Sequence, residues 1–141
     1  MYYVTYDKPK KISDQLIDSA ILFASKFLDL DDYIEIDFSD KFEHDRCGYC
    51  DYDEDGVTIF INSKMDRKKI IVTLFHEMVH ARQFIRGMLV LPENSTQPSR
   101  WLGKEYDVPY FESPWELEAY ELELVMWDIF TKDLNLNIKN S

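Results

Sequence analysis

The stretch of residues 69–85 constrains the fold most, because its apolar residues recur at helical spacing and extend round most of a helix. Positions 76–80 within it read HEMVH. Two histidines four residues apart lie one turn above each other on the same helical face, so His76 and His80 can reach one tetrahedral zinc ion. Glu77 would then stand beside the ion, where it can accept a proton from a water molecule. The pattern is typical of a metallohydrolase.

A five-residue pattern is short, and a histidine on an apolar helix is more often a satisfied core residue than a metal ligand. The rest of the helix favours metal binding. Its apolar side chains leave a single polar stripe, formed by Lys69, Thr73, His76, His80 and Gln83. Burying two imidazoles without partners costs free energy. A zinc ion would satisfy both rings.

Length, composition and charge restrict the remaining possibilities. The 141 residues suit one domain, 1–141, and the 45% hydrophobic and 15% aromatic content indicates an ordered globule. Sixteen basic and 27 acidic side chains give a net charge of −11, which disfavours nucleic acid and anionic membranes as partners. The oligomeric state is not indicated.

The sequence also favours a cytoplasmic protein. Its first residues lack the basic segment and apolar core of a secretory signal. The longest apolar run, residues 70–75, is interrupted by Thr73 and is too short to span a bilayer. In that compartment the two cysteines, Cys47 and Cys50, are expected to be reduced.

The pattern before the motif predicts an α+β fold. Residues 13–28 carry apolar side chains at helical spacing and predict an amphipathic helix. Residues 33–38 alternate as a strand does. Residues 47–52 and 57–61 are two further strand candidates, and the Asp-Gly pair at 55–56 between them predicts a hairpin.

Local signals also set the ends of the elements around the motif. Asp66 can cap the motif helix, and Gly87 can end it. Residues 88–112 show no sustained period, and we interpret them as a long, ordered loop that packs over the site. Ser113 and Pro114 then begin a final helix to about residue 130, and the last ten residues are expected to fray.

A catalytic zinc needs a third protein ligand, and the final helix offers several glutamates. The candidates there are Glu116, Glu118, Glu121 and Glu123; the one remaining histidine, His44, lies near the predicted hairpin. Glu116 is the first choice, with Glu118 or Glu121 as alternatives. However, Ser113-x-x-Glu116 also fits a capping box, in which the Glu116 carboxylate would only bond the backbone N–H of the cap.

The order helix, β-hairpin, HExxH helix, loop and glutamate-bearing helix resembles the gluzincin peptidases, especially the small single-domain minigluzincins. In that family a glutamate from a later helix completes a His-His-Glu site, and the order Glu-x-x-Ala maps this ligand onto Glu116. The pattern from Trp101 through Tyr106 to Glu116 is also similar to proteins of bacteriophage genomes. The resemblance implies a minimal zincin-like domain and, for a phage protein, the host cytoplasm.

Two other patterns invite a functional interpretation. Cys47-Gly48-Tyr49-Cys50 has the spacing of a redox pair, but it precedes a turn rather than a helix, so we interpret it as two strand cysteines with Gly48 allowing close packing. With His44 it keeps open a small structural zinc site. Asp51-x-Asp53-x-Asp55-Gly56 begins like an EF-hand loop but lacks the glutamate of its second half, so a turn is favoured.

Together these features lead us to expect a zinc metallopeptidase. His76, His80 and Glu116 would hold Zn²⁺, Glu77 would act as general base, and an extended peptide or protein substrate would align on the strand at 57–61. Tyr106 or Tyr110 could polarise the substrate carbonyl. The alternative is a non-catalytic binding or structural protein that zinc only stabilises.

Overall fold

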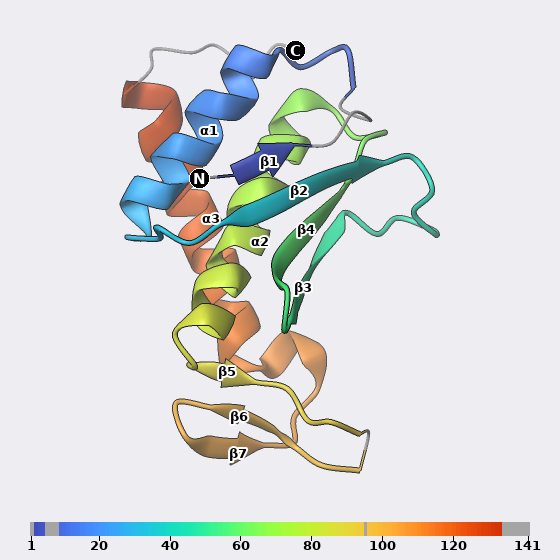
Figure 1. Cartoon of the computed structure of the whole chain (residues 1–141), viewed down its shortest axis with the longest axis vertical. Coiled ribbons are helices and arrows are strands. Elements are labelled where there is room, and N and C mark those ends of the chain that lie inside the picture. Colours follow the sequence, from blue (N-terminus) through green and yellow to red (C-terminus); the bar gives the residue numbers. More distant parts are fainter. Residues whose placement is uncertain (1, 5–8, 95, 134–141) are drawn as a thin grey trace.

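The computed structural model describes residues 2–4, 9–94 and 96–133 and has the α+β fold that the sequence predicts. Three helices lie on one side of a four-stranded sheet, with α3 packed on α2, and a smaller sheet lies at one end (Figure 1). In chain order the elements are β1 (Tyr2–Val4), α1 (Asp14–Phe27), β2 (Ile34–Ser39), β3 (Gly48–Asp53), β4 (Gly56–Asn62), α2 (Arg67–Ile85), β5 (Leu89–Val90), β6 (Ser99–Trp101), β7 (Lys104–Tyr106), the 3-10 turn η1 (Tyr110–Glu112) and α3 (Pro114–Asp133).

The helix starts follow the capping signals. Ser13 caps α1 by accepting a hydrogen bond from the backbone N–H of Leu16 at 3.1 Å. Asp66 caps α2 in the same way, accepting from Lys69 N–H at 2.8 Å. Gly87, at a φ of +69°, follows the end of α2 in the left-handed conformation that glycine adopts without strain. These predictions are confirmed.

The order of the four-stranded sheet is β1-β2-β4-β3. Strands β1, β2 and β4 are parallel, and β3 forms an antiparallel hairpin with β4. The expectation that a substrate aligns on an exposed strand at 57–61 is therefore wrong, because β4 lies between β2 and β3 and both of its edges are paired. One face of β4 is apolar and buried, with Val57, Ile59 and Ile61, and on the other face the Phe60 ring stacks on Tyr49.

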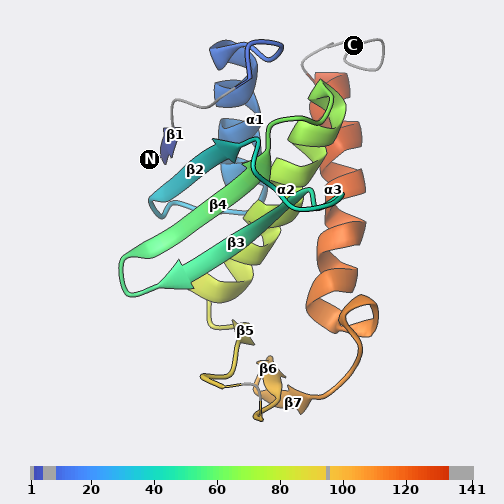
Figure 2. The same ribbon diagram turned by 90° about the vertical axis from the view of Figure 1, so that its right-hand side faces the viewer.

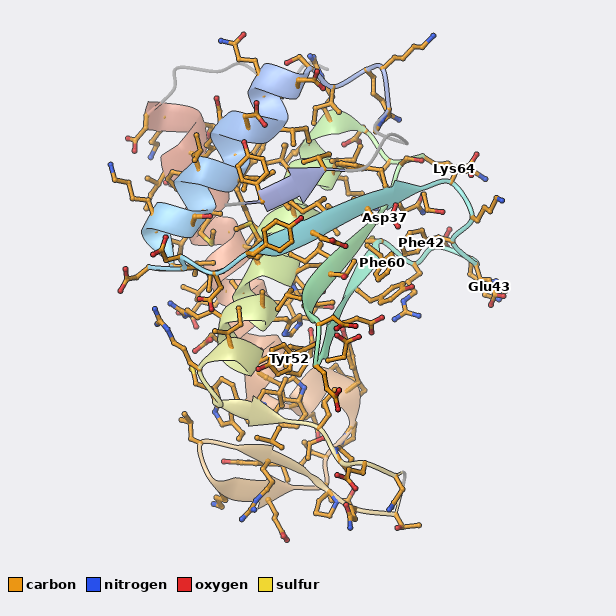
Figure 3. All side chains as sticks on the ribbon, viewed as in Figure 1. Asp37, Phe42, Glu43, Tyr52, Phe60 and Lys64 are labelled. Atoms are coloured by element: carbon orange, nitrogen blue, oxygen red, sulfur yellow. The ribbon has the colours of Figure 1, made fainter. Side chains whose placement is uncertain are left out.

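The main core lies between this sheet and the helices (Figure 2). Helix α2 occupies the centre and contacts both the sheet and α3. Its apolar residues Ile70, Ile71, Leu74, Phe75, Met78 and Val79 are fully buried. The side-chain view in Figure 3 shows Phe60 projecting to the side of the sheet away from the helices, and Tyr52 near the turn of the β3–β4 hairpin. Because α2 is packed on several sides, the positions of its polar side chains are fixed.

The segment predicted as an irregular loop contains a three-stranded antiparallel sheet, in the order β5-β6-β7. These strands have only two or three residues each, so they leave no sustained sequence period. Trp101 is largely buried, and its ring lies 6.4 Å from that of Trp115 at the start of α3. The segment is ordered as expected, although it has more regular structure.

The short strand β1 was not predicted from the sequence. Residues 134–141, which include most of the predicted frayed end, lie outside the described part of the chain. None of the three helices in the described ranges has the length and apolarity that a membrane crossing needs.

Candidate metal centre

Helices α2 and α3 run side by side in opposite directions and form the candidate site. Near the end of α2, the Gln83 side chain donates to the backbone carbonyl of Trp115 at 3.0 Å; near its start, the Lys68 ammonium lies 5.5 Å from the centre of the Trp127 ring. This pairing places the first turns of α3 opposite the histidines of α2.

Three buried side chains converge there, His76, His80 and Glu116, and all are at least 93% buried, with exposed fractions of 7%, 7% and 4%. The Glu116 Oε1 atom lies 3.0 Å from His76 Nε2, and its Oε2 atom lies 2.9 Å from His80 Nε2. The two Nε2 atoms are 3.2 Å apart. Among the described residues, this is the one group of at least three His, Cys, Asp or Glu side chains positioned to hold a metal ion.

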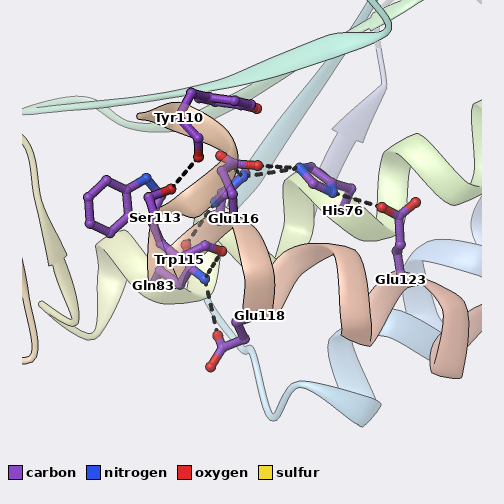
Figure 4. A network of polar contacts seen from close by, with 9 residues as sticks. His76, Gln83, Tyr110, Ser113, Trp115, Glu116, Glu118 and Glu123 are labelled. Carbon is purple, nitrogen blue, oxygen red and sulfur yellow. Dashed lines mark hydrogen bonds and ion pairs between the residues drawn. The ribbon is translucent and has the colours of Figure 1, made fainter. Parts of the chain in front are cut away.

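The other nitrogen of each imidazole is held by a separate polar side chain. His76 Nδ1 lies 3.1 Å from Glu123 Oε1, and His80 Nδ1 lies 2.7 Å from Gln83 Oε1 (Figure 4 shows the contacts of His76). These oxygens can only accept, so each Nδ1 carries a proton, and each Nε2 can present its lone pair to a metal ion when one is bound. Such partners fix the orientation of metal-binding histidines.

The donor set fits a divalent metal ion. The two Nε2 atoms and the Glu116 carboxylate point at one another, and a shared cation, either a metal ion or protons on the Nε2 atoms, offsets the repulsion among them. Nitrogen and oxygen ligands of tetrahedral zinc lie about 2.0–2.2 Å from the ion, which separates the ligand atoms by roughly 3.3 Å. The observed separations are close to that value. The three residues can therefore hold a metal ion.

The geometry decides between the two interpretations of Glu116. The backbone N–H of Ser113 donates to the Tyr110 carbonyl at 3.2 Å, and the Ser113 hydroxyl donates to the same carbonyl at 2.7 Å. Both capping groups of Ser113 thus have partners other than Glu116, whose carboxylate contacts the two imidazoles. The capping-box alternative is not realised.

The other candidate ligands lie elsewhere. Glu118 accepts from the Gln83 side-chain amide at 3.1 Å and lies 3.5 Å from the Arg82 guanidinium. Glu121 is exposed, and its position two residues before Glu123 puts it on a different face of α3. His44 is exposed in the turn before β3, at a φ of +56°. None of them joins the group around His76.

The sequence did not reveal the role of Glu123 as a partner of His76. Glu123 follows Glu116 by seven residues, which is two helical turns, so both project from the same face of α3. The position four residues after Glu116 is Tyr120, whose ring packs 4.8 Å from the His76 ring. The seven-residue spacing between Glu116 and Glu123 was the signal in the sequence that could have indicated this role.

The electrostatics of the group are those of an ion-pair cluster. Burial lowers the pKa of His76, but its hydrogen bonds to Glu116 and Glu123 outweigh this effect and raise the pKa to about 10. Burial likewise opposes ionisation of Glu116, but the two imidazoles lower its pKa to about 2. The pKa of Glu77 is raised mainly by burial, against the opposing charges of His80, His76 and Arg46.

The site opens into a cavity of about 880 Å³ that lies between α2, α3 and β3. Glu77 lines this cavity beside His76, His80 and Glu116. Tyr110 lines it too, and burial and the nearby Glu116 carboxylate raise the pKa of its hydroxyl, whereas Tyr106 packs edge-on against Trp115, with ring centres 6.3 Å apart. Of the two tyrosines that the sequence suggested, only Tyr110 reaches the site.

Both cysteines are free, and they line the cavity from β3 and the residue before it. They form no metal-binding group with His44 among the described residues. Gly48 between them is required sterically: a Cβ atom would lie 2.5 Å from the Phe60 carbonyl oxygen and 3.0 Å from Thr73 Cγ2. The Asp-rich segment forms the β3–β4 turn, with Asp55 N–H donating to the Asp53 side chain at 2.9 Å.

No family model, curated protein or solved structure matches this chain. The class of site is therefore defined by its own geometry: a buried His-His-Glu group on two packed helices that could hold a metal ion.

Proposed function

We propose that the protein is a zinc-dependent metallohydrolase, most simply a peptidase. The observation that carries the proposal is the convergence of His76, His80 and Glu116 at the base of a cavity, with Glu77 beside them and each imidazole held through Nδ1. When bound, zinc supplies a Lewis acid that polarises a carbonyl and lowers the pKa of water.

Glu77 is assigned the role of general base. It follows His76 on α2 and lines the cavity, and its carboxylate is not engaged by the groups that hold the imidazoles. Burial raises its pKa, which makes its carboxylate a stronger base than an exposed glutamate. Glu77 would accept the proton of the attacking water and return it to the leaving amine.

A peptide substrate would align on β3, the strand at the cavity edge of the four-stranded sheet. An extended segment can add to such an edge through backbone hydrogen bonds. Tyr110, which lines the cavity with Glu116, would donate a hydrogen bond to the substrate carbonyl. This assignment replaces the strand at 57–61, whose two edges are already paired.

The test combines metal analysis with hydrolysis of unfolded casein or a peptide library. Protein purified without chelators should contain about one zinc per chain, because the group forms one site. Glu77→Gln should retain zinc and lose hydrolysis by about two to four powers of ten, the usual contribution of a general base. Zinc binding with no hydrolysis by the native protein would instead identify a zinc-stabilised binding or structural protein.

A further inference from the structure

The cavity has a direction, because β3 and α2 run alongside each other in the same sense. Gly48, at the start of β3, lies beside Thr73 in the first half of α2. Tyr52, near the end of β3, stacks on Phe84 near the end of α2, with ring centres 5.6 Å apart and an interplanar angle of 5°. His76, Glu77 and His80 lie between these two contacts along α2.

The two ends of the cavity differ in chemistry. Arg46 and Lys69 line the end near Thr73, and four apolar side chains line the other: Phe84, Leu89, Leu91 and Trp115. Arg46 is held by the Tyr49 ring, with its guanidinium 4.6 Å from the ring centre. In the described part of the chain, neither Arg46 nor Lys69 forms an ion pair with a carboxylate.

Two cations with no carboxylate at ion-pair distance are notable in a chain with 27 acidic and 16 basic side chains, and of the two only Arg46 is near enough to Glu77 to lower its pKa. Both are exposed, and both face the cavity that contains the metal-binding group. Lys69 precedes His76 by seven residues, which is roughly 10 Å along a helix. An extended peptide advances about 3.3 Å per residue, so this distance corresponds to about three substrate residues.

Pairing with β3 decides which side of the substrate reaches the cations. A segment that adds antiparallel to β3 has its amino-terminal part near Tyr52 and its carboxyl-terminal part near Gly48 and Arg46. We propose, on the basis of the function proposed above, that Arg46 and Lys69 bind a substrate carboxylate two or three residues beyond the scissile bond. The apolar end then receives a hydrophobic side chain on the amino-terminal side.

This carboxylate can be a free C-terminus or an acidic side chain, and one set of probes distinguishes them. The probes are succinyl hydroxamates followed by one to four residues, each made as the free acid, the amide, and the amide with a final Glu. The hydroxamate chelates zinc and anchors every probe alike. Affinity for the zinc-loaded protein is measured by calorimetry, so turnover is not needed.

The free acid with two or three residues should bind about tenfold more tightly than its amide. If the Glu-containing amide equals the free acid, the site recognises an acidic side chain; if it does not, the site recognises a C-terminus. Arg46→Gln and Lys69→Met should each reduce the preference, whereas Arg46→Lys and Lys69→Arg should preserve it. Arg100→Gln on β6, whose side chain does not line the cavity, is the matched control.

Two results would overturn the inference and are distinguishable from each other. If acids and amides bind equally at every length, the proposed carboxylate site is contradicted, whereas the metal centre is not. Failure of every hydroxamate to bind counts against the metal centre itself and therefore also against the inference that rests on it.

Discussion

Glu123 accepts a hydrogen bond from His76 Nδ1 at 3.1 Å, two turns along α3 from Glu116, which contacts His76 through Nε2. The same helix therefore holds both nitrogens of one imidazole. His80 has a different arrangement, because its Nδ1 is held by Gln83 from its own helix. The orientation of His76 depends on how α3 packs on α2.

Glu123→Gln should weaken zinc binding without abolishing it. The amide can still contact His76 but no longer provides a charged acceptor, and loss of such an outer partner typically costs about 10–100-fold in metal affinity. Competition with a chromophoric chelator measures the change. Glu121→Gln, exposed on the same helix, is the matched control and should leave the affinity unchanged.

Glu116→Gln should weaken zinc binding more than Glu123→Gln does, because it removes an anionic ligand rather than a supporting contact. The variant should still fold, since Ser113 satisfies its own capping groups without Glu116. Circular dichroism and the same chelator competition measure both properties. Unchanged zinc affinity in this variant would remove Glu116 from the site.

Cys47→Ser combined with Cys50→Ser should leave the zinc content unchanged. Both thiols line the cavity, but the His-His-Glu group already provides three ligands. Elemental analysis of the double variant, beside the native protein, measures the effect. A fall in zinc to well below one ion per chain would mean that a thiolate takes part in binding.

Gly48→Ala should destabilise the protein by about 1–3 kcal/mol, the usual cost of overpacking. The new methyl group would meet the Phe60 carbonyl at 2.5 Å, a rigid backbone group, and would push β3 away from β4 and α2. Urea unfolding gives the free energy of unfolding. Asp51→Ala, at an exposed position of the same strand, should change it by much less.

The stability of chelator-treated protein should depend on pH in a defined way. The pKa of His76 is raised to about 10, so its contribution is complete below its ordinary value of 6.5 and is lost as the pH rises towards 10. The pKa of Glu116 is lowered to about 2, so its contribution is complete above 4.5 and is lost as the pH falls towards 2. The site should therefore stabilise this form most between about pH 4.5 and 6.5. Thermal melts of native protein and of His76→Asn across this range measure the difference, which should shrink on both sides of the window.

Local signals in the sequence were sufficient for the helices, the hairpin and the two histidines. Caps at Ser13 and Asp66 and the Asp-Gly turn act within a few residues, so a single chain displays them. The pairing of β2 with β4 was not evident, because strand order depends on contacts between residues more than 20 positions apart. The high apolar content of β4, with Val57, Ile59, Phe60 and Ile61, was the one indication of its central place.

In the site, too, local spacing could be predicted from the sequence, whereas contacts between distant residues could not. The spacing of His76 and His80 placed both on one face, but the choice of Glu116 over Glu118 required the rotation of α3 about its axis, which a sequence does not display. Gln83 belonged to the polar stripe predicted for α2, and the structure gives it its task, the contact with His80. Glu123 could be assigned only after the two helices were placed side by side.

The contact between His76 and Glu116 joins residues that are 40 positions apart, and the intervening chain includes all of β5, β6 and β7. An ion held there would close this segment into a ring, as a disulfide does, and so reduce the conformational entropy of the unfolded chain wherever the ion stays bound. The cost of closing a loop grows only slowly with its length. Insertions in the β5–β7 segment should therefore change the thermodynamics of metal-coupled folding very little, which leaves that segment free to diverge while the centre is kept.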